Sequence, residues 1–169
     1  MNIQDAVLGE TKHTFQLDGI QADAEAVALL INQARSVVNI YSKRLYPLIY
    51  DSSPIIEACH QFCMRSSRTK INILVDHTRL LSQKSHRLLS LSHRHSSSIF
   101  IKKTHPDFIH RSDEFCCIDR NAYFKLDNSE HYLATCNFSD SLITGDLLSF
   151  YKDAWERSAA DPELSSYIL

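Results

Sequence analysis

Glycine is scarce in this chain: only three of its 169 residues are glycine, at positions 9, 19 and 145. A loop that cradles phosphate or a dinucleotide needs several glycines at fixed spacings, and no such group is present. The Gly-x-Ser-x-Gly turn that presents a nucleophilic serine in α/β-hydrolases is also absent. The sequence therefore argues against P-loop nucleotide hydrolases, dinucleotide-binding enzymes and α/β-hydrolases.

Long apolar runs are missing as well. No stretch approaches the length of a membrane span, and the first residues lack the basic start and apolar core of a secretory signal. The cysteines are odd in number and form no compact framework, which favours reduced thiols over disulfides. We therefore expect a cytoplasmic protein with no membrane span. The five cysteines are Cys59, Cys63, Cys116, Cys117 and Cys136.

Neither sign of charge dominates, because 18 Lys and Arg oppose 20 Asp and Glu, for a net charge of −2. The whole chain is therefore not attracted to nucleic acid by its net charge. The distribution is uneven, since residues 77–106 carry six Lys or Arg and five His without any acid. Such a segment indicates an anion-binding face or, as is commoner for charged runs, a solvated helix and loop.

Helix and strand patterns alternate along most of the chain. We expect an α/β fold in which a mixed β-sheet is flanked by helices on both faces and the last strands form an antiparallel meander. The length fits one domain over residues 1–169, with a core at about 20–158 and peripheral tails at 1–19 and 159–169. The patterns predict helices at 21–35, 54–63, 79–91 and 142–157, and strands at 37–41, 71–75, 99–101, 114–119, 122–126 and 132–136.

The most specific pattern lies in the last third. It begins with His110-Arg111-Ser112, continues through Cys116-Cys117-Ile118-Asp119 and ends with Ala134-Thr135-Cys136-Asn137. This block resembles the His-x-Lys-x4-Asp…Gly-Ser-x-Asn motif of the phospholipase D superfamily, with the lysine absent. The order of elements over about residues 20–158 is similar to one repeat of that family, and the end of the chain resembles a proteobacterial group of degenerate domains of this type. The resemblance implies a phospholipase D-like fold.

The resemblance also implies roles for single residues. In active members histidine attacks phosphorus, lysine and asparagine hold phosphate oxygens, and an acid orients the imidazole. His110 matches the nucleophile, while Ser112 stands at the lysine position and brings no charge. Cys117 stands at the aspartate position, and Asp119, two residues further on, would need a bulge to replace that acid. An alternative for His110 is a structural histidine whose imidazole is hydrogen-bonded by Asp113 or by the backbone.

Two residues of the motif's second half remain: Thr135 supplies a hydroxyl and Asn137 the amide. Loss of one transition-state donor alone typically costs about 10²- to 10³-fold in rate. We therefore expect a catalytically degenerate bacterial domain that binds a phosphate-containing anionic ligand, such as nucleic acid, or a partner protein, with Ser112, Thr135 and Asn137 as ligand-binding residues. A homodimer follows from the resemblance, because the family pairs two motifs and this chain has one.

Two alternatives stay open. The first is an active phosphodiesterase or nuclease in which His110 is the nucleophile and Asp119 the orienting acid. The second is an interaction domain with no ligand pocket.

We expect no cofactor and no metal. Cys59, His60 and Cys63 resemble a small metal cluster, but zinc normally takes four ligands and no second pair stands at a suitable spacing. Cys59 and Cys63 share one helix face while His60 points elsewhere, which favours buried thiols. The segment His93-Arg94-His95 could bind metal or phosphate, although a solvated loop is the favoured interpretation.

Overall fold

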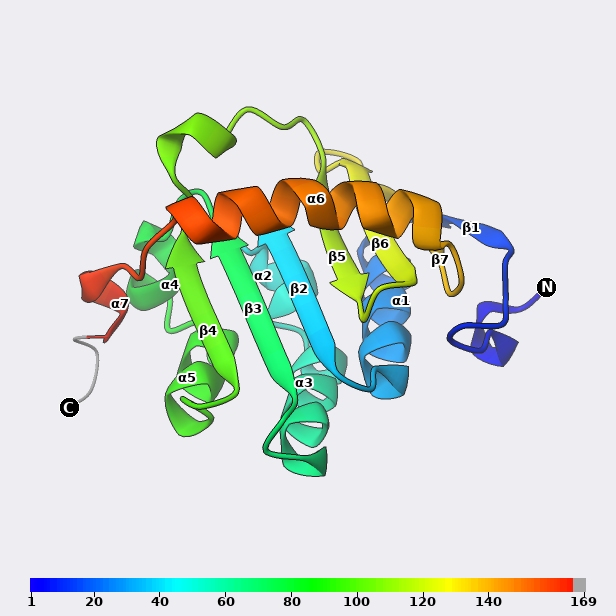
Figure 1. Ribbon diagram of the computed structural model, residues 1–169, viewed down its shortest axis with the longest axis horizontal. Coiled ribbons are helices and arrows are strands. Elements are labelled where there is room, and N and C mark those ends of the chain that lie inside the picture. The colour runs from blue at the N-terminus through cyan, green and yellow to red at the C-terminus, as the bar shows by residue number, and fades with distance from the viewer. Residues whose placement is uncertain (166–169) are drawn as a thin grey trace.

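A computed structural model describes residues 1–165 of the chain. Its centre is a seven-stranded mixed sheet with the strand order β1-β7-β6-β5-β2-β3-β4 (Figure 1). The predicted α/β class is confirmed. The strands are β1 (Thr14–Asp18), β2 (Val37–Ser42), β3 (Lys70–Val75), β4 (Ile99–Lys103), β5 (Glu114–Ile118), β6 (Ala122–Asn128) and β7 (Leu133–Asn137).

The sheet has a parallel half and an antiparallel half. Strands β2, β3 and β4 run parallel, in register from Val38 beside Ile71 and Ile99. From β2 outward, β5, β6, β7 and β1 each pair antiparallel with the preceding neighbour, which confirms the predicted meander. The amino end of β5 therefore lies beside the carboxyl end of β2, where Tyr41 pairs with Phe115.

Helices cover the two faces unequally. Figure 1 shows α6 alone across one face, near the carboxyl ends of the parallel strands, while α1, α2, α3 and α5 lie on the other. Each face has its own apolar core, because the short strands β2 and β5 are buried on both sides. The helices are α1 (Ile20–Gln33), α2 (Pro47–Tyr50), α3 (Ser53–Arg65), α4 (Arg79–Gln83), α5 (Arg87–Arg94), α6 (Ser141–Arg157) and α7 (Pro162–Ser165).

The predicted helix over 79–91 is wrong, because two short helices replace it. Ser85 has a left-handed backbone (φ 51°), and His86 is buried at the break. The His86 Nδ1 accepts the Leu88 N–H (3.1 Å) as the N-cap of α5, and its Nε2 lies 2.9 Å from the Leu45 carbonyl oxygen. Both imidazole nitrogens of His86 therefore have hydrogen-bond partners at the point where the helix is interrupted.

The N-terminal segment also differs from the expected peripheral tail. Strand β1 pairs with β7 at one edge of the sheet, and Phe15 and Leu17 are buried against α1 and the sheet. Gly19 (φ 103°) then turns the chain directly into α1, a conformation that favours glycine. At the other end, an isolated bridge joins Lys103 to Ala159, and Leu164 of α7 is buried; residues 166–169 of the expected C-terminal tail lie outside the described residues.

Within residues 1–165, none of the helices combines the length and apolar character needed to cross a membrane.

Candidate functional site

The sheet edge formed by the carboxyl ends of β2, β3 and β4 is the candidate site, and we call it the carboxyl edge. Open α/β sheets bind ligands just beyond this edge of their parallel strands. Backbone hydrogen bonds continue past the strands, from the Asp76 N–H to the Ser42 carbonyl and from the Thr104 N–H to the Val75 carbonyl. The connection from β4 to β5, which carries the beginning of the motif, passes over this edge (Figure 1).

A buried carboxyl, Glu114, anchors the beginning of β5 at this edge. Its Oε1 accepts the Ser42 hydroxyl (2.7 Å) and the backbone N–H of Lys43 (2.7 Å). The side chain is 3% exposed. Burial raises the pKa of Glu114, and the hydrogen bonds from Ser42 and Lys43 oppose that rise. Glu114 therefore joins β5 to the end of β2 and has no free lone pair on Oε1 for a ligand.

A second buried carboxyl, Asp76, lies at the end of β3. The Tyr41 hydroxyl donates to its Oδ2 (2.9 Å), and burial raises the pKa of Asp76. Burial, then the negative charge of Asp76, also raises the pKa of Tyr41. The interior of the carboxyl edge therefore holds two acids, where a phosphoryl-transfer site needs positive groups or neutral donors.

The Arg111 guanidinium is immobilised. Its Nε and Nη2 donate to the two carboxylate oxygens of Asp113, each at 2.7 Å, and its Cζ lies 4.6 Å from the centre of the Phe150 ring. Lys125 approaches Asp113 as well, at 3.8 Å. The charge of Asp113 is thus matched by Arg111 and Lys125, and not by His110 as the sequence alternative supposed.

His110 and Ser112 both lie exposed in the connection to β5, outside regular structure. The Ser112 carbonyl accepts the Lys43 ammonium at 3.3 Å. The His110 imidazole makes no hydrogen bond or ion pair with any residue in the part of the chain that the structure describes. Nothing at this position fixes one ring nitrogen, which a nucleophilic imidazole requires.

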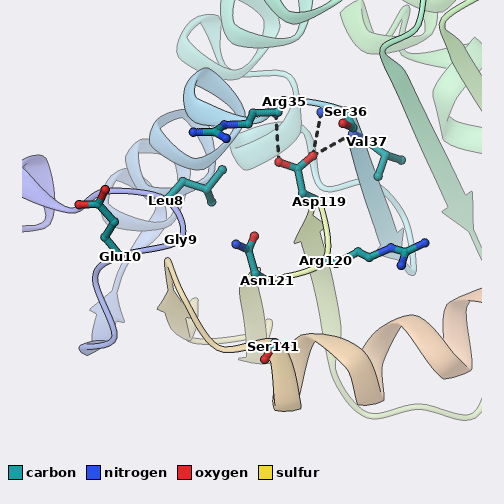
Figure 2. Close-up of a pocket in the computed structure, with 10 residues that line it drawn as sticks. All are labelled: Leu8, Gly9, Glu10, Arg35, Ser36, Val37, Asp119, Arg120, Asn121 and Ser141. Atoms are coloured by element: carbon teal, nitrogen blue, oxygen red, sulfur yellow. Dashed lines mark hydrogen bonds between the residues drawn. The ribbon is translucent and has the colours of Figure 1, made fainter.

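Asp119 lies at the opposite end of β5. It occupies a turn with a left-handed backbone (φ 53°), and its carboxylate accepts the backbone N–H groups of Arg35 (3.0 Å), Ser36 (2.8 Å) and Val37 (3.0 Å). Figure 2 shows this triple contact. It lies in the wall of a cleft of about 840 Å³ that Asn121 and Ser141 also line. The four residue-to-residue steps of β5 place the two ends of the strand roughly 13 Å apart. Asp119 therefore cannot orient the His110 imidazole in this structure.

Asn137 and Thr135 lie on β7, also away from His110. The Asn137 Nδ2 donates to the Lys12 carbonyl (3.0 Å) and to the Thr14 hydroxyl (3.1 Å), and its Oδ1 accepts the Ser139 N–H (2.8 Å). In the sheet register Asn137 is level with Tyr123, two strands out from Cys117 and near the Asp119 end of β5. The predicted site residues are therefore dispersed: His110 and Ser112 lie at the carboxyl edge, and Asp119 and Asn137 lie toward the opposite edge. Thr135 is level with Phe115, near the amino end of β5, but two strands out from it.

Part of the basic segment 77–106 gathers at the carboxyl edge. His77, Arg79 and Lys103 line a cleft of about 640 Å³ together with Ser82, Gln83 and the acids Asp161 and Glu163. Asp161 accepts the Thr78 hydroxyl at 2.6 Å, a bond that lowers its pKa. Within residues 1–165 no ion pair joins His77, Arg79 or Lys103 to a carboxylate.

Two other cations of the segment are engaged elsewhere. Arg87 pairs with Asp51 at 2.7 Å, and the Lys102 ammonium lies 4.3 Å from the centre of the Trp155 ring. The segment therefore does not form one continuous basic surface.

The sequence analysis missed Ser42, Asp76 and Glu114 as site residues. A usable signal was present, because Ser42 and Asp76 each stand where a predicted parallel strand ends, and such positions meet at one edge. Glu114 gave no comparable signal, since its importance depends on the antiparallel pairing of β5 with β2.

All five cysteines are buried, as expected for core thiols. In the described range no group of three or more His, Cys, Asp or Glu side chains is arranged to hold a metal ion.

The fold is similar to that of three solved structures. NucT from Helicobacter pylori matches with a TM-score of 0.67 and 12% identity, covering 88% of this chain and 99% of that chain. Nuc from Salmonella typhimurium, a phospholipase D family member, matches with a TM-score of 0.62 and 12% identity over the same shares of the two chains. The archaeal chromatin protein TrmBL2 matches with a TM-score of 0.64 and 12% identity over 90% of this chain, which spans 55% of the length of that one. The chain has a phospholipase D-like fold.

The family is defined by sequence. A family model described as a domain of unknown function, DUF7931, matches residues 20–167, and the chain belongs to that family. No curated protein sequence matches it significantly.

Proposed function

We propose that this chain is a catalytically inactive phospholipase D-like domain that works by binding. The observation that carries the proposal is the position of Asp119. In the His-x-Lys-x4-Asp motif the aspartate follows the histidine by seven residues and the lysine by five. If Asp119 is that aspartate, Ser112 stands at the histidine position and Glu114 at the lysine position. In this register the motif needs no bulge, because Asp119 directly follows the last residue of β5. The nucleophile is then absent, and a carboxyl replaces the cation.

The chemistry supports this register over the one that begins at His110. Glu114 is buried and already bound to Ser42 and Lys43, so it cannot stabilise negative charge on a phosphoryl group. The alternative, a phosphodiesterase with His110 as nucleophile and Asp119 as orienting acid, requires the two side chains to meet, and β5 separates them.

For the ligand, we propose a phosphate-containing polyanion, nucleic acid in the first place, at the carboxyl edge. Arg79 and Lys103 supply cationic groups around one cleft, without an ion pair within residues 1–165, and His77 lines the same cleft. Backbone phosphates are bound chiefly by such cations. The likeness in fold to a DNA-binding chromatin protein agrees with this choice.

We also propose a homodimer formed through the α6 face. The sheet below α6 is open, with a groove of about 510 Å³ lined by Asn39, Asn72, Leu148 and Trp155. Phe100 is 39% exposed and shares this face, because it pairs in register with Asn72. Leu142, at the start of α6, is 77% exposed. A second copy seated here would cover these apolar groups and would bring two motif segments toward one interface, as the family resemblance implies.

The proposal is tested by binding of fluorescent single-stranded DNA to the wild type and to the double variant Arg79→Ala/Lys103→Ala, across a series of salt concentrations. Each phosphate contact on a single strand contributes a slope of about −0.7 to the plot of log K against log salt. The double variant should therefore bind more weakly and lose about 1.4 from the slope. Arg68→Ala is the matched control, since Arg68 is an exposed cation in the loop between α3 and β3, at the opposite edge of the sheet. Equal weakening by the control, or no binding by the wild type, would contradict the proposed ligand.

A further inference from the structure

Two histidines outside the carboxyl edge face one another across a helix contact. His60 lies within α3, and His95 directly follows α5 as its C-cap residue. The nearest ring nitrogens, His60 Nδ1 and His95 Nε2, are 3.0 Å apart, and both side chains are partly exposed. The His95 carbonyl accepts the Ile99 N–H at the beginning of β4, so the pair lies near the amino end of that strand, on the face opposite α6 (Figure 1).

We propose that His60 and His95 form a chelating site for a divalent transition metal ion of the Zn²⁺, Ni²⁺ and Cu²⁺ class. Imidazole nitrogens bind these ions at about 2.0–2.1 Å. Two such nitrogens on one ion lie about 3.0 Å apart at a right angle and about 3.4 Å apart at the tetrahedral angle. The observed separation thus fits neighbouring positions of a square-planar or octahedral ion, and a tetrahedral ion needs only a small rotation of one ring.

The protonation of the pair suits metal binding. A hydrogen bond between the two facing nitrogens at 3.0 Å requires a proton on one of them and a lone pair on the other. When the ion binds, that proton leaves the facing nitrogen, and its ring takes up a proton at the far nitrogen from solvent. The neutral pair therefore binds with no net release of protons.

The surroundings make the site a nitrogen and oxygen site with open positions. Cys59 and Cys63 lie on the same helix but are buried, and burial raises the pKa of the Cys63 thiol to about 11. Thiolates are therefore not supplied to an ion at the surface. Water completes the coordination, so binding should follow the order in which Cu²⁺ binds more tightly than Ni²⁺ or Zn²⁺. A bound ion would fasten the end of α5 to α3.

The experiment is a calorimetric titration of the full chain with Ni²⁺, and separately with Zn²⁺, in a buffer that does not bind metal. The expected result is one ion per chain, with the dissociation constant raised at least about tenfold by either His60→Gln or His95→Gln. His77→Gln is the matched control, because His77 is an exposed histidine at the carboxyl edge. Binding by the control should equal that of the wild type.

A thermal melt separates loss of the site from loss of the fold. Ni²⁺ should raise the melting temperature of the wild type and of His77→Gln, and should leave both pair variants unchanged, although each keeps a cooperative transition of its own. If a glutamine variant fails to fold, the matching alanine variant is titrated, and retention of the metal effect there overturns the proposal. Wild-type protein that takes up no metal at millimolar concentration, or pair variants that bind as tightly as the wild type, would also overturn it.

Discussion

Substitutions at Asp119 test whether its carboxylate has a structural or a catalytic role. Its two oxygens accept three backbone N–H groups at 2.8–3.0 Å, and these bonds join the end of β5 to the beginning of β2, 82 to 84 residues away. No substrate contact is needed to explain the residue. We therefore expect substitutions here to lower the free energy of unfolding.

The magnitude follows from the contacts. Hydrogen bonds to a charged group contribute about 1.5–3 kcal/mol each when well shielded. Two of the three are solvent-exposed, so about 1 kcal/mol each, or about 3 kcal/mol together, is the reasonable figure. Alanine also pays for the left-handed backbone at φ 53°, about 1 kcal/mol, which asparagine and glycine largely avoid. Asp119→Ala should cost about 3–4 kcal/mol, Asp119→Gly about 3 kcal/mol and Asp119→Asn about 1–2 kcal/mol.

Urea unfolding of the wild type and the three variants, followed by circular dichroism, measures these differences. The expected order of stability is Asp, Asn, Gly, Ala, and the alanine variant should melt roughly 6–16 °C below the wild type. A cost below about 1 kcal/mol for Asp119→Ala would refute the structural role. Ala and Gly variants of equal stability would refute the strain part of the reasoning alone.

Three further predictions concern other parts of the molecule. Asp23 is fully buried in the first turn of α1, and burial, then the charge of Asp18, raises its pKa to about 7. The folded state therefore keeps a proton that the unfolded chain releases, so the stability of the wild type should fall between about pH 4 and pH 7, by up to ~4 kcal/mol relative to Asp23→Asn. Denaturation curves of both proteins across this pH range measure the difference, and identical pH dependence of the two would contradict the prediction. Glu114→Ala should lower the free energy of unfolding by about 2–4 kcal/mol, because it leaves the Ser42 hydroxyl and the Lys43 N–H without their acceptor. Glu114→Gln should lower it less. Equal stability of the wild type and both variants in urea would contradict the anchoring role of Glu114. Leu142→Glu should convert a dimer to a monomer in light scattering while the melting transition stays cooperative, and an unchanged mass would exclude this part of α6 from the interface.

The sequence patterns predicted the fold well where apolar periodicity is strong. The strands over β2, β3 and β5 and the helix over α6 are close to their predicted bounds, because each buries a continuous or periodic apolar set. Strand β1 was missed because Thr14–Asp18 is a five-residue edge strand whose pattern makes sense only beside β7. The break between α4 and α5 was missed because it depends on His86 reaching the Leu45 carbonyl, 41 residues away.

The candidate site was less predictable for a similar reason. Ser112 and Asp119 belong to the same short segment of the motif, yet they lie at opposite ends of β5. Spacing along the chain does not show which end of the strand faces a ligand. The motif predicts that Asn137 binds phosphate, but in the structure its side-chain amide is hydrogen-bonded to Lys12, Thr14 and Ser139. The register that we propose for the motif rests on the position of Asp119 directly after β5, which spacing along the chain does not give.

The most direct test of the central claim is turnover of a bis-aryl phosphodiester and of single-stranded DNA by purified wild-type protein, measured beside His110→Ala. The account predicts no turnover by the wild type above that of a buffer blank, and therefore no difference between the two proteins. Wild-type turnover that His110→Ala abolishes, with its fold intact by circular dichroism, would show that the motif still works and would contradict the account.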